Sequence, residues 1–224
     1  MNDTLSIVQV IKTKDGSNTL LHQQYNEIYH SRNGAYSEAM HVFVNAGLFY
    51  QLQFFDTISI LEVGFGSGLN CILSLANNTK KINYTGVDVL PIEWNTVVEL
   101  GYPLLESVKA VESDYRKIID AKWNSKHQIN DNFILTKLTN CMLGIELPKL
   151  YNLVYFDAFA PNVQPNMWHI DVFKKIYENL ETGAVLVTYC AKGQVKRDLM
   201  EVGFTIEKLE GPPGKREMIR ATKA

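Results

Sequence analysis

Three segments of the sequence carry residues suited to binding a phosphate- or sugar-containing ligand, and each comes at the end of an apolar run. Gly64, Gly66 and Gly68 alternate after the run 58–63. Glycine at alternate positions lets the chain turn sharply and approach a ligand closely, and a following helix offers free N–H groups at its start. Asp88 and Asp157 stand at the ends of two further runs. We expect the chemistry at these run ends.

The elements that position these residues alternate between strands and helices. Strands are predicted at 58–63, 82–89, 133–138, 150–156 and 184–189, and helices at 69–75, 94–100, 104–119, 167–180 and 195–202. Residues 122–131 are polar and predict a loop, and 204–209 with 217–222 predict a final antiparallel pair. This order predicts an α/β fold with a mostly parallel sheet and helices on both faces. Ligands of such sheets bind beyond the carboxyl ends of the strands.

The first 55 residues follow a different pattern. Polar and apolar residues alternate over 6–12 and 19–25, and the turn-forming residues 14–18 separate these runs, so we predict a hairpin. Apolar residues at helical spacing follow over 37–54. The sequence therefore divides into an N-terminal extension, 1–55, and an α/β core, 56–224.

Composition narrows the function classes. The chain has 224 residues, 46% of them hydrophobic and 21% charged, which is typical of one soluble globular domain. The net charge of −2 argues against a non-specific nucleic-acid binder. Residues 191–224 hold eight Lys or Arg against five Asp or Glu, a net +3, which is compatible with a small anion-binding face.

The cysteines and the apolar runs indicate in which cellular compartment the protein is expected and whether it binds metal or membrane. Three cysteines without a C-x-x-C pair indicate a reducing compartment, buried thiols and no metal cluster. No apolar run approaches the roughly 18 residues of a membrane helix, and the first ten residues show no signal peptide. We expect a cytoplasmic protein that binds neither metal nor membrane.

The spacing of the glycines narrows the choice of cofactor. It is G-x-G-x-G, whereas the dinucleotide fingerprint needs a small residue where Leu69 stands, and no Gly-Lys-Ser/Thr follows. The loop resembles the first motif of class I (Rossmann-like) S-adenosylmethionine-dependent methyltransferases. Asp88, twenty residues after Gly68, is suited to accept both hydroxyls of a ribose, as acids in NAD enzymes also do. Asn140 ends the third strand, where either an adenine contact or a helix N-cap fits.

A narrower resemblance comes from several motifs together. Residues 29–31 read Tyr-His-Ser, 62–70 read EVGFGSGLN, 156–161 read FDAFAP, 165–168 read PNMW and 215–218 read KREM. In this order they resemble the methyltransferase domain of the MnmC family, including its stand-alone members. The resemblance implies methylation of the primary amine of 5-aminomethyl-(2-thio)uridine at the tRNA wobble position. The flavin-dependent oxidase domain of the fused relatives is not expected here, so methylation alone is implied.

The resemblance also implies roles for individual residues. Asp157 is the expected catalytic residue, which orients the amine and helps to take its proton. S-adenosylmethionine is expected to contact Glu62, Gly64, Gly66, Ser67, Gly68, Asn70, Asp88 and Asn140. The tRNA substrate is expected to contact Tyr29, Glu38, Phe159, Lys215 and Arg216.

The sequence departs from the family pattern at three of its positions. Asp88 stands where some relatives have Glu, Asn140 where Asp is expected, and Val163 where fused relatives can have Lys. Two histidines, His30 and His41, are expected to make structural hydrogen bonds rather than to catalyse.

Two other functions compete with this interpretation. The first is a class I methyltransferase acting on a small molecule or a protein, which the low net charge fits. The second is a nucleotide-binding oxidoreductase or a non-catalytic α/β module, which the G-x-G-x-G spacing disfavours.

Overall fold

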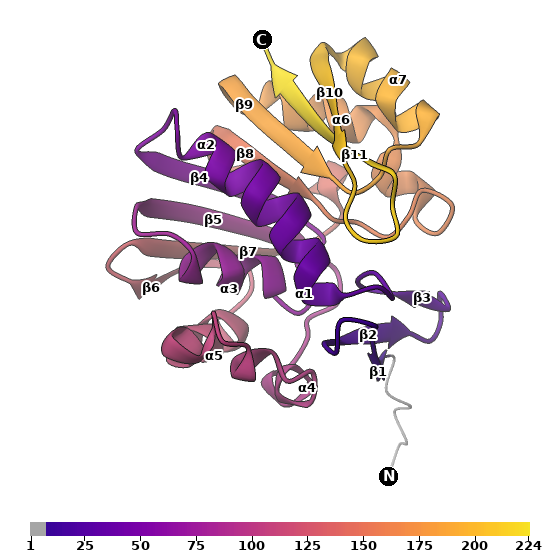
Figure 1. The fold of residues 1–224 in the computed structure, drawn as a ribbon. Helices are drawn as coiled ribbons and strands as arrows, with labels where there is room; N and C mark the ends of the chain where they lie inside the picture. Colours follow the sequence, from indigo (N-terminus) through magenta and orange to yellow (C-terminus); the bar gives the residue numbers. More distant parts are fainter. Residues whose placement is uncertain (1–7) are drawn as a thin grey trace.

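A central eight-stranded sheet in the order β10-β11-β9-β8-β4-β5-β7-β6 forms the framework of the protein (Figure 1). The computed structural model describes residues 8–224. Neighbouring strands from β9 to β7 run parallel, and antiparallel strands close both edges. The strands of this sheet are β4 (Thr57–Val63), β5 (Lys81–Asp88), β6 (Ser125–Asn130), β7 (Phe133–Thr139), β8 (Tyr151–Phe156), β9 (Leu180–Thr188), β10 (Phe204–Glu210) and β11 (Glu217–Lys223).

Helices cover both faces of this sheet, as α/β sequences require. One face carries a helical segment made of α1 (Ala35–Glu38), a π-helical stretch (Ala39–Leu48) and α2 (Phe49–Gln51), together with α3 (Leu69–Ala76) and α5 (Glu112–Asp120). The other face carries α6 (Ile170–Glu178) and α7 (Gly193–Val202). The short α4 (Trp94–Glu99) precedes α5. Each face packs its own apolar core against the sheet.

The chain order creates a switch point beside β4. The chain enters the sheet at β4 and continues to β5 and β7 on one side, whereas β8 and β9 are added on the other side. Connections leave in opposite directions there, which opens a crevice beyond the carboxyl ends of the strands. Strand β8 is buried along its whole length, because helices cover both of its faces. The predicted α/β fold with a mostly parallel sheet is confirmed.

The N-terminal part forms a small sheet of its own. Strands β1 (Val8–Lys12) and β2 (Asn18–His22) pair antiparallel, which confirms the predicted hairpin, and β3 (Glu27–Ile28) adds a third, short strand. Ser6 and Ile7, where the predicted run began, and most of the segment inspected for a signal peptide lie outside the described residues. Figure 1 shows this sheet beside α1, at one end of the molecule.

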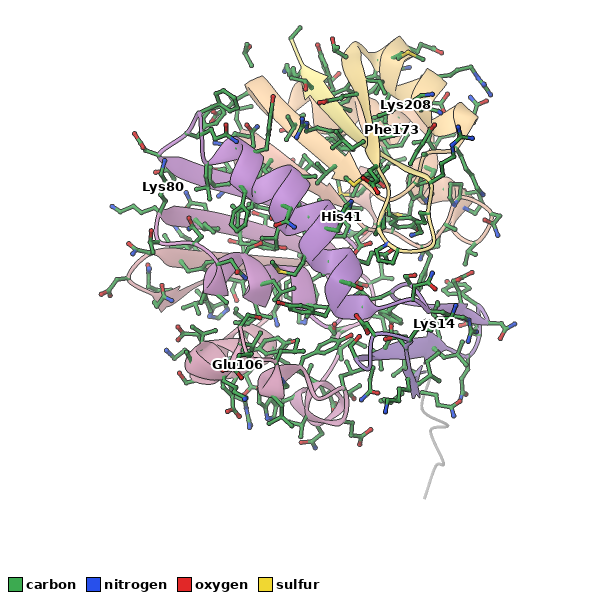
Figure 2. All side chains as sticks on the ribbon, viewed as in Figure 1. Lys14, His41, Lys80, Glu106, Phe173 and Lys208 are labelled. Carbon is green, nitrogen blue, oxygen red and sulfur yellow. The ribbon has the colours of Figure 1, made fainter. Side chains whose placement is uncertain are left out.

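The helical segment 35–51 also contacts the C-terminal hairpin. Figure 2 shows His41 on this segment where it crosses in front of the sheet. Its Nε2 lies 2.9 Å from the carbonyl oxygen of Glu210 on β10. Ring nitrogen Nδ1 of His30 lies 3.1 Å from the Thr19 hydroxyl. Both histidines thus make the structural hydrogen bonds that the sequence predicted.

Three sequence predictions were wrong. Residues 125–130 form strand β6 rather than a loop, because a sheet edge tolerates polar side chains and buries only Ile129. The helix predicted over 104–119 is α5 alone, preceded by two short 3₁₀ turns, 102–104 and 109–111. Cys141 is exposed, whereas Cys71 and Cys190 are buried as expected.

Two further properties of residues 8–224 bear on partners. No helix within them has the length and apolar character to cross a membrane. They bring together no group of three or more His, Cys, Asp or Glu side chains arranged to hold a metal ion.

Candidate functional site

A pocket opens at the switch point, beyond the carboxyl ends of β4, β5 and β8. Its open space is about 760 Å³ when the solvent in its mouth is included. The core contributes the glycine loop, the ends of β5 and β8 and the loop after β8; the N-terminal sheet supplies an aromatic wall. Of the expected site residues, the pocket lining includes Tyr29, Gly64, Gly66, Asn70, Asp88, Asn140, Asp157 and Phe159.

The glycine loop forms the floor of this pocket. Gly66 has φ +51°, and a Cβ atom there would stand 3.1 Å from the Tyr29 ring. Gly64 has φ +93°, and its Cβ would meet the carbonyl oxygen of Asp157 at 2.4 Å. Backbone of this kind strongly favours glycine. Gly68, also left-handed, precedes α3 and packs under Phe65 and Ile119, outside the pocket lining.

Asp88 ties the end of β5 to this loop. Its Oδ2 accepts a hydrogen bond from the backbone N–H of Gly66 at 2.8 Å, and its Oδ1 accepts from Val89 and Leu90 at 2.7 and 3.0 Å. Burial raises the pKa of this carboxyl, and the three N–H donors oppose that rise. A carboxylate has about four acceptor positions. Three of these positions are used, so the Asp88 Oδ2 keeps about one acceptor position, enough for one ribose hydroxyl.

Asp157 follows β8 and lies across the pocket floor from Asp88. Its Oδ2 accepts a hydrogen bond from the side-chain amide of Asn70 at 2.9 Å. The same amide donates to Glu62 Oε1 at 2.9 Å, and the Tyr84 hydroxyl donates to Glu62 Oε2 at 2.8 Å. Glu62 is fully buried and lies behind Asn70, outside the pocket lining.

The environment of Asp157 disfavours its charged form. Burial, and then the nearby Glu38 carboxylate, raise the pKa of Asp157 well above its usual range, whereas Asn70 and Lys215 oppose this rise. Burial also raises the pKa of Glu62 strongly. A carboxyl with a raised pKa is suited to accept a proton during a reaction near neutral pH.

An aromatic wall faces the acidic floor. The Tyr29 and Phe159 rings meet edge to face with their centroids 5.1 Å apart. His22 stacks on Tyr25 at 4.4 Å and also contacts Phe159. Burial lowers the pKa of His22, so the neutral ring is favoured in this wall. Sequence reasoning did not select His22, Tyr25, Gln164 or Met167, all of which line the pocket.

The position of Trp168 explains how the loop after β8 is held. This side chain is buried in the core, and its indole N–H donates to the carbonyl oxygen of Phe159 at 2.7 Å. The amide oxygen of Gln164 accepts from the backbone N–H of Phe159 at 3.2 Å. These hydrogen bonds support the loop after β8, of which Phe159, Gln164 and Met167 line the pocket.

The pocket lining does not include four other expected site residues, Glu38, Ser67, Lys215 and Arg216. Glu38 is buried and forms an ion pair with Lys215 at 2.6 Å. Arg216 is exposed on the neighbouring turn. Ser67 is buried, and its hydroxyl has no hydrogen-bond partner within residues 8–224. Asn140 lines the pocket, and its Oδ1 accepts from the N–H of Cys141 at 2.8 Å. The short helix 142–144 begins after Cys141 and receives no side-chain cap, so the N-cap interpretation is wrong, whereas the adenine contact stays a prediction.

Comparison with known proteins identifies the family. A family model described as S-adenosyl-L-methionine-dependent methyltransferase matches residues 106–224, more than half of the chain. The chain belongs to this methyltransferase family. Its cofactor is therefore S-adenosylmethionine, and the oxidoreductase alternative is excluded.

Individual relatives extend this likeness. A protein from Burkholderia multivorans named tRNA 5-methylaminomethyl-2-thiouridine biosynthesis bifunctional protein MnmC is 30% identical over 220 residues, which cover 90% of this chain and 33% of that protein. A protein of the same name from Ralstonia nicotianae is 29% identical and covers 87% of this chain and 31% of its own length. The chain thus spans about a third of the length of these curated relatives.

Solved structures support the fold. The crystal structure of MnmC2 from Aquifex aeolicus superposes with a TM-score of 0.75 at 22% identity and covers all of this chain and 72% of that one. An amino pentose methyltransferase from Micromonospora echinaspora, solved with S-adenosylmethionine bound, gives 0.54 at 12% identity, covering 86% of this chain and 93% of its own. The Rossmann-like class I methyltransferase fold is confirmed.

The pocket of the methyltransferase fits this cofactor. Gly66 leaves room over the loop that a side chain would fill, and the Asp88 carboxylate keeps acceptor capacity for a ribose hydroxyl. The carboxamide oxygen of Asn70 is buried in the pocket floor without a hydrogen-bond partner in the described part of the chain. Glycine backbone, a hydroxyl acceptor and an unpaired acceptor suit a ligand with a ribose and amine groups.

Proposed function

We propose that this methyltransferase acts on tRNA and methylates the primary amine of 5-aminomethyl-(2-thio)uridine at the wobble position. The observation that carries the proposal is the position of Asp157, which lines the pocket together with the glycine loop and the aromatic side chains of Tyr29 and Phe159. The relatives named MnmC, matched over most of this chain, support the same substrate. A cytoplasmic location and the division into an extension, 1–55, and a core, 56–224, belong to this proposal.

The site residues divide into three groups in this proposal. Those that hold the cofactor are Glu62, Gly64, Gly66, Ser67, Gly68, Asn70, Asp88 and Asn140, with Glu62 acting through Asn70. S-adenosylmethionine, when bound, supplies a methyl group on a positively charged sulfur. Asp157 orients the substrate amine and takes up its proton, since only the neutral amine has a lone pair to react. The substrate residues are Tyr29, Glu38, Phe159, Lys215 and Arg216.

The aromatic wall gives the proposal its nucleobase site. Tyr29 and Phe159 present an edge-to-face pair to the pocket, and a pyrimidine ring that has been unstacked from RNA packs well against such side chains. Arg216 is exposed, and in this proposal its guanidinium contacts a phosphate of the tRNA. Lys215 is engaged by Glu38, so its contribution to the substrate is indirect.

The decisive experiment uses the purified chain, S-adenosylmethionine and two tRNAs, with no added flavin. One tRNA carries 5-aminomethyl-2-thiouridine and the other carries the 5-carboxymethylaminomethyl form. We expect the 5-methylaminomethyl product from the first alone, because the carboxymethyl group occupies the amine of the second and adds a negative charge. Nucleoside mass spectrometry reads both reactions. Absence of product from verified aminomethyl tRNA would overturn the proposal in favour of a small-molecule or protein substrate.

A further inference from the structure

Asn70 lies at the centre of a buried network that the proposed mechanism does not yet use. It is the second residue of α3, it is 2% exposed, and it lines the pocket floor. Its side-chain nitrogen donates to two carboxyl groups from different strand ends, Glu62 and Asp157, at 2.9 Å each. One amide group therefore connects the glycine-loop strand to the expected catalytic residue.

The surroundings of Asn70 fix the orientation of its amide. With Asp157 as the carboxylate that takes up the proton, the reverse orientation would set the carboxamide oxygen against the Asp157 Oδ2. Glu62 is itself held, because the Tyr84 hydroxyl donates to its other oxygen at 2.8 Å. The Ser74 hydroxyl donates to the backbone carbonyl of Asn70 at 2.8 Å. Both the side-chain nitrogen and the backbone of Asn70 are thus held by neighbouring groups.

This arrangement leaves the carboxamide oxygen of Asn70 without a partner. It is buried, and nothing within residues 8–224 donates to it. Gln51 Oε1 shares this property, but Gln51 lies outside the pocket. A buried acceptor without a donor is costly, and at Asn70 a ligand entering the pocket can supply the missing N–H.

We propose that the carboxamide oxygen of Asn70 is a second acceptor for the reacting amine, beside the carboxylate of Asp157. The inference rests on the proposed function. A neutral primary amine carries two N–H bonds and one lone pair. A single acceptor lets the amine rotate about its hydrogen bond, whereas two acceptors fix both N–H bonds and so fix the direction of the lone pair.

The reaction then follows from this alignment. The nitrogen lone pair forms the new N–C bond to the methyl group while the C–S bond breaks, and its electron pair stays on sulfur as a neutral thioether. The nitrogen becomes a secondary ammonium and gives one proton to Asp157. Precise alignment of such partners is a main source of rate in group transfer.

The same arrangement limits the reaction to a single methylation. The neutral form of the product is a secondary amine with one N–H and one lone pair. It cannot donate to both acceptors, so its lone pair is not fixed toward the methyl group. The pair formed by Asn70 and Asp157 therefore selects a primary amine over a secondary amine.

The test compares Asn70→Leu with the wild type on tRNA bearing the 5-aminomethyl group and on tRNA bearing the 5-methylaminomethyl group. Leucine has a similar size and no hydrogen-bonding group. We expect kcat/KM on the primary amine to fall roughly 10²-fold, the loss that misplacement of a reacting group can cause. The much slower reaction of the secondary amine should change little, so the preference for the primary amine collapses. A general structural defect would lower both rates by the same factor.

Gln51→Leu is the matched control. It removes a buried carboxamide whose nitrogen donates to the backbone carbonyls of Asn152 and Gly183 and whose oxygen is also unpaired, but which lies away from the pocket. We expect Gln51→Leu to change stability and leave the preference for primary amines intact. Asn70→Ala provides a second folded variant if Asn70→Leu is unstable.

Both the substrate and the cofactor carry an amine, and a binding measurement shows which of the two contacts the Asn70 oxygen. Calorimetry of both Asn70 variants uses S-adenosylhomocysteine, which has an α-amine, and methylthioadenosine, which lacks one. Because Asn70 is also among the residues proposed to hold the cofactor, we expect any loss of affinity to be the same for both ligands. Weakening confined to S-adenosylhomocysteine would assign the oxygen to the cofactor's amine and overturn the proposal, as would an unchanged preference for primary amines. If the wild type methylates neither tRNA, the proposed function itself fails, and this inference fails with it.

Discussion

The side-chain Oδ2 of Asp88 accepts a hydrogen bond from the backbone N–H of Gly66 at 2.8 Å. This contact joins the end of β5 to the loop after β4, and both residues line the pocket. The carboxylate thus holds the glycine loop against the end of β5 across 22 positions of the chain. In the proposed function it also accepts a hydrogen bond from a ribose hydroxyl.

Loss of the Asp88 carboxylate should weaken cofactor binding. Asp88→Ala removes the acceptor of Gly66 N–H and the acceptor for the ribose. We expect S-adenosylmethionine affinity to fall by roughly 1.5–3 kcal/mol, the range for hydrogen bonds to a charged group, measured by calorimetry. The affinity for tRNA should be nearly unchanged. A loss of tRNA binding with normal cofactor binding would place Asp88 in the substrate site.

A side chain at Gly66 should block the cofactor. In Gly66→Val the Cβ would lie 3.1 Å from the Tyr29 ring, over the pocket floor. We expect no measurable binding of S-adenosylmethionine by a folded but less stable protein. Gly183→Val is the control, since it imposes a similar backbone strain at φ +78° with nothing within 4 Å of its Cβ. Normal affinity in folded Gly66→Val would remove this loop from the cofactor site.

Asp157 should be needed for turnover more than for cofactor binding. Asp157→Ala is expected to lower methyl transfer about 10²–10⁴-fold, the usual range for a positioned acid or base, and to keep most of the cofactor affinity. Because burial raises the pKa of this carboxyl, the pH profile of kcat/KM should have an ascending limb at pH values above the ordinary pKa of an aspartate. Asp157→Asn should remove that limb. Near-normal turnover of Asp157→Ala would reduce the residue to a structural role.

Glu62 should make stability depend on pH in a particular direction. Its pKa is raised by burial above the ordinary 4.5, so the folded chain holds this proton more tightly than the unfolded chain. The protonated Glu62 contributes fully to the free energy of unfolding below its pKa in the unfolded chain. This contribution is lost as the pH rises through its pKa in the folded chain. We therefore expect the stability of the wild type relative to Glu62→Gln to decrease above about pH 4.5, measured by urea unfolding.

The exposed Glu106 provides the comparison for this pH effect. Lys109 lowers its pKa, so its small contribution is present above the unfolded pKa and is lost as pH falls through the folded one. The stability of the wild type relative to Glu106→Gln should therefore increase with pH, opposite to the result for Glu62→Gln. The same slope for both variants would contradict the raised pKa of the buried Glu62.

The ion pair between Glu38 and Lys215 should contribute to stability. Glu38 is 5% exposed, and Lys215 also packs 3.7 Å from the centre of the Tyr189 ring. Lys215→Met leaves a buried carboxylate unpaired, so we expect a loss of about 1–3 kcal/mol in urea unfolding. Lys109→Met, which breaks an exposed pair with Glu106, should cost less than about 1 kcal/mol. Equal losses of unfolding free energy in the two variants would show that the ion pair of Glu38 stabilises the fold no more than an exposed pair does.

Local patterns in the sequence were enough to predict the framework and its chemistry. Continuous apolar runs predict β4, β5 and β8, because strands covered on both faces must be apolar throughout. Alternate glycines predict the loop, because that backbone excludes most side chains. The carboxyl ends of parallel strands meet at one edge, so Asp88 and Asp157, which end two of these strands, predict a ligand site there. The missed strand β6 has no such pattern, because its edge position leaves mostly polar side chains in solvent.

Only the tertiary structure decided which distant side chains complete the site. His22 enters the pocket because the N-terminal sheet lies against the loop after β8, where His22 contacts Phe159. Glu38 and Lys215 pair across 177 positions of the chain, a contact for which neither neighbourhood contains a signal. Asn70 follows the glycine loop in the sequence, but its hydrogen bond to Asp157 requires β4 and β8 to be neighbours in the sheet. Periodicity and turn residues act over a few positions, whereas these contacts depend on how whole strands and helices pack.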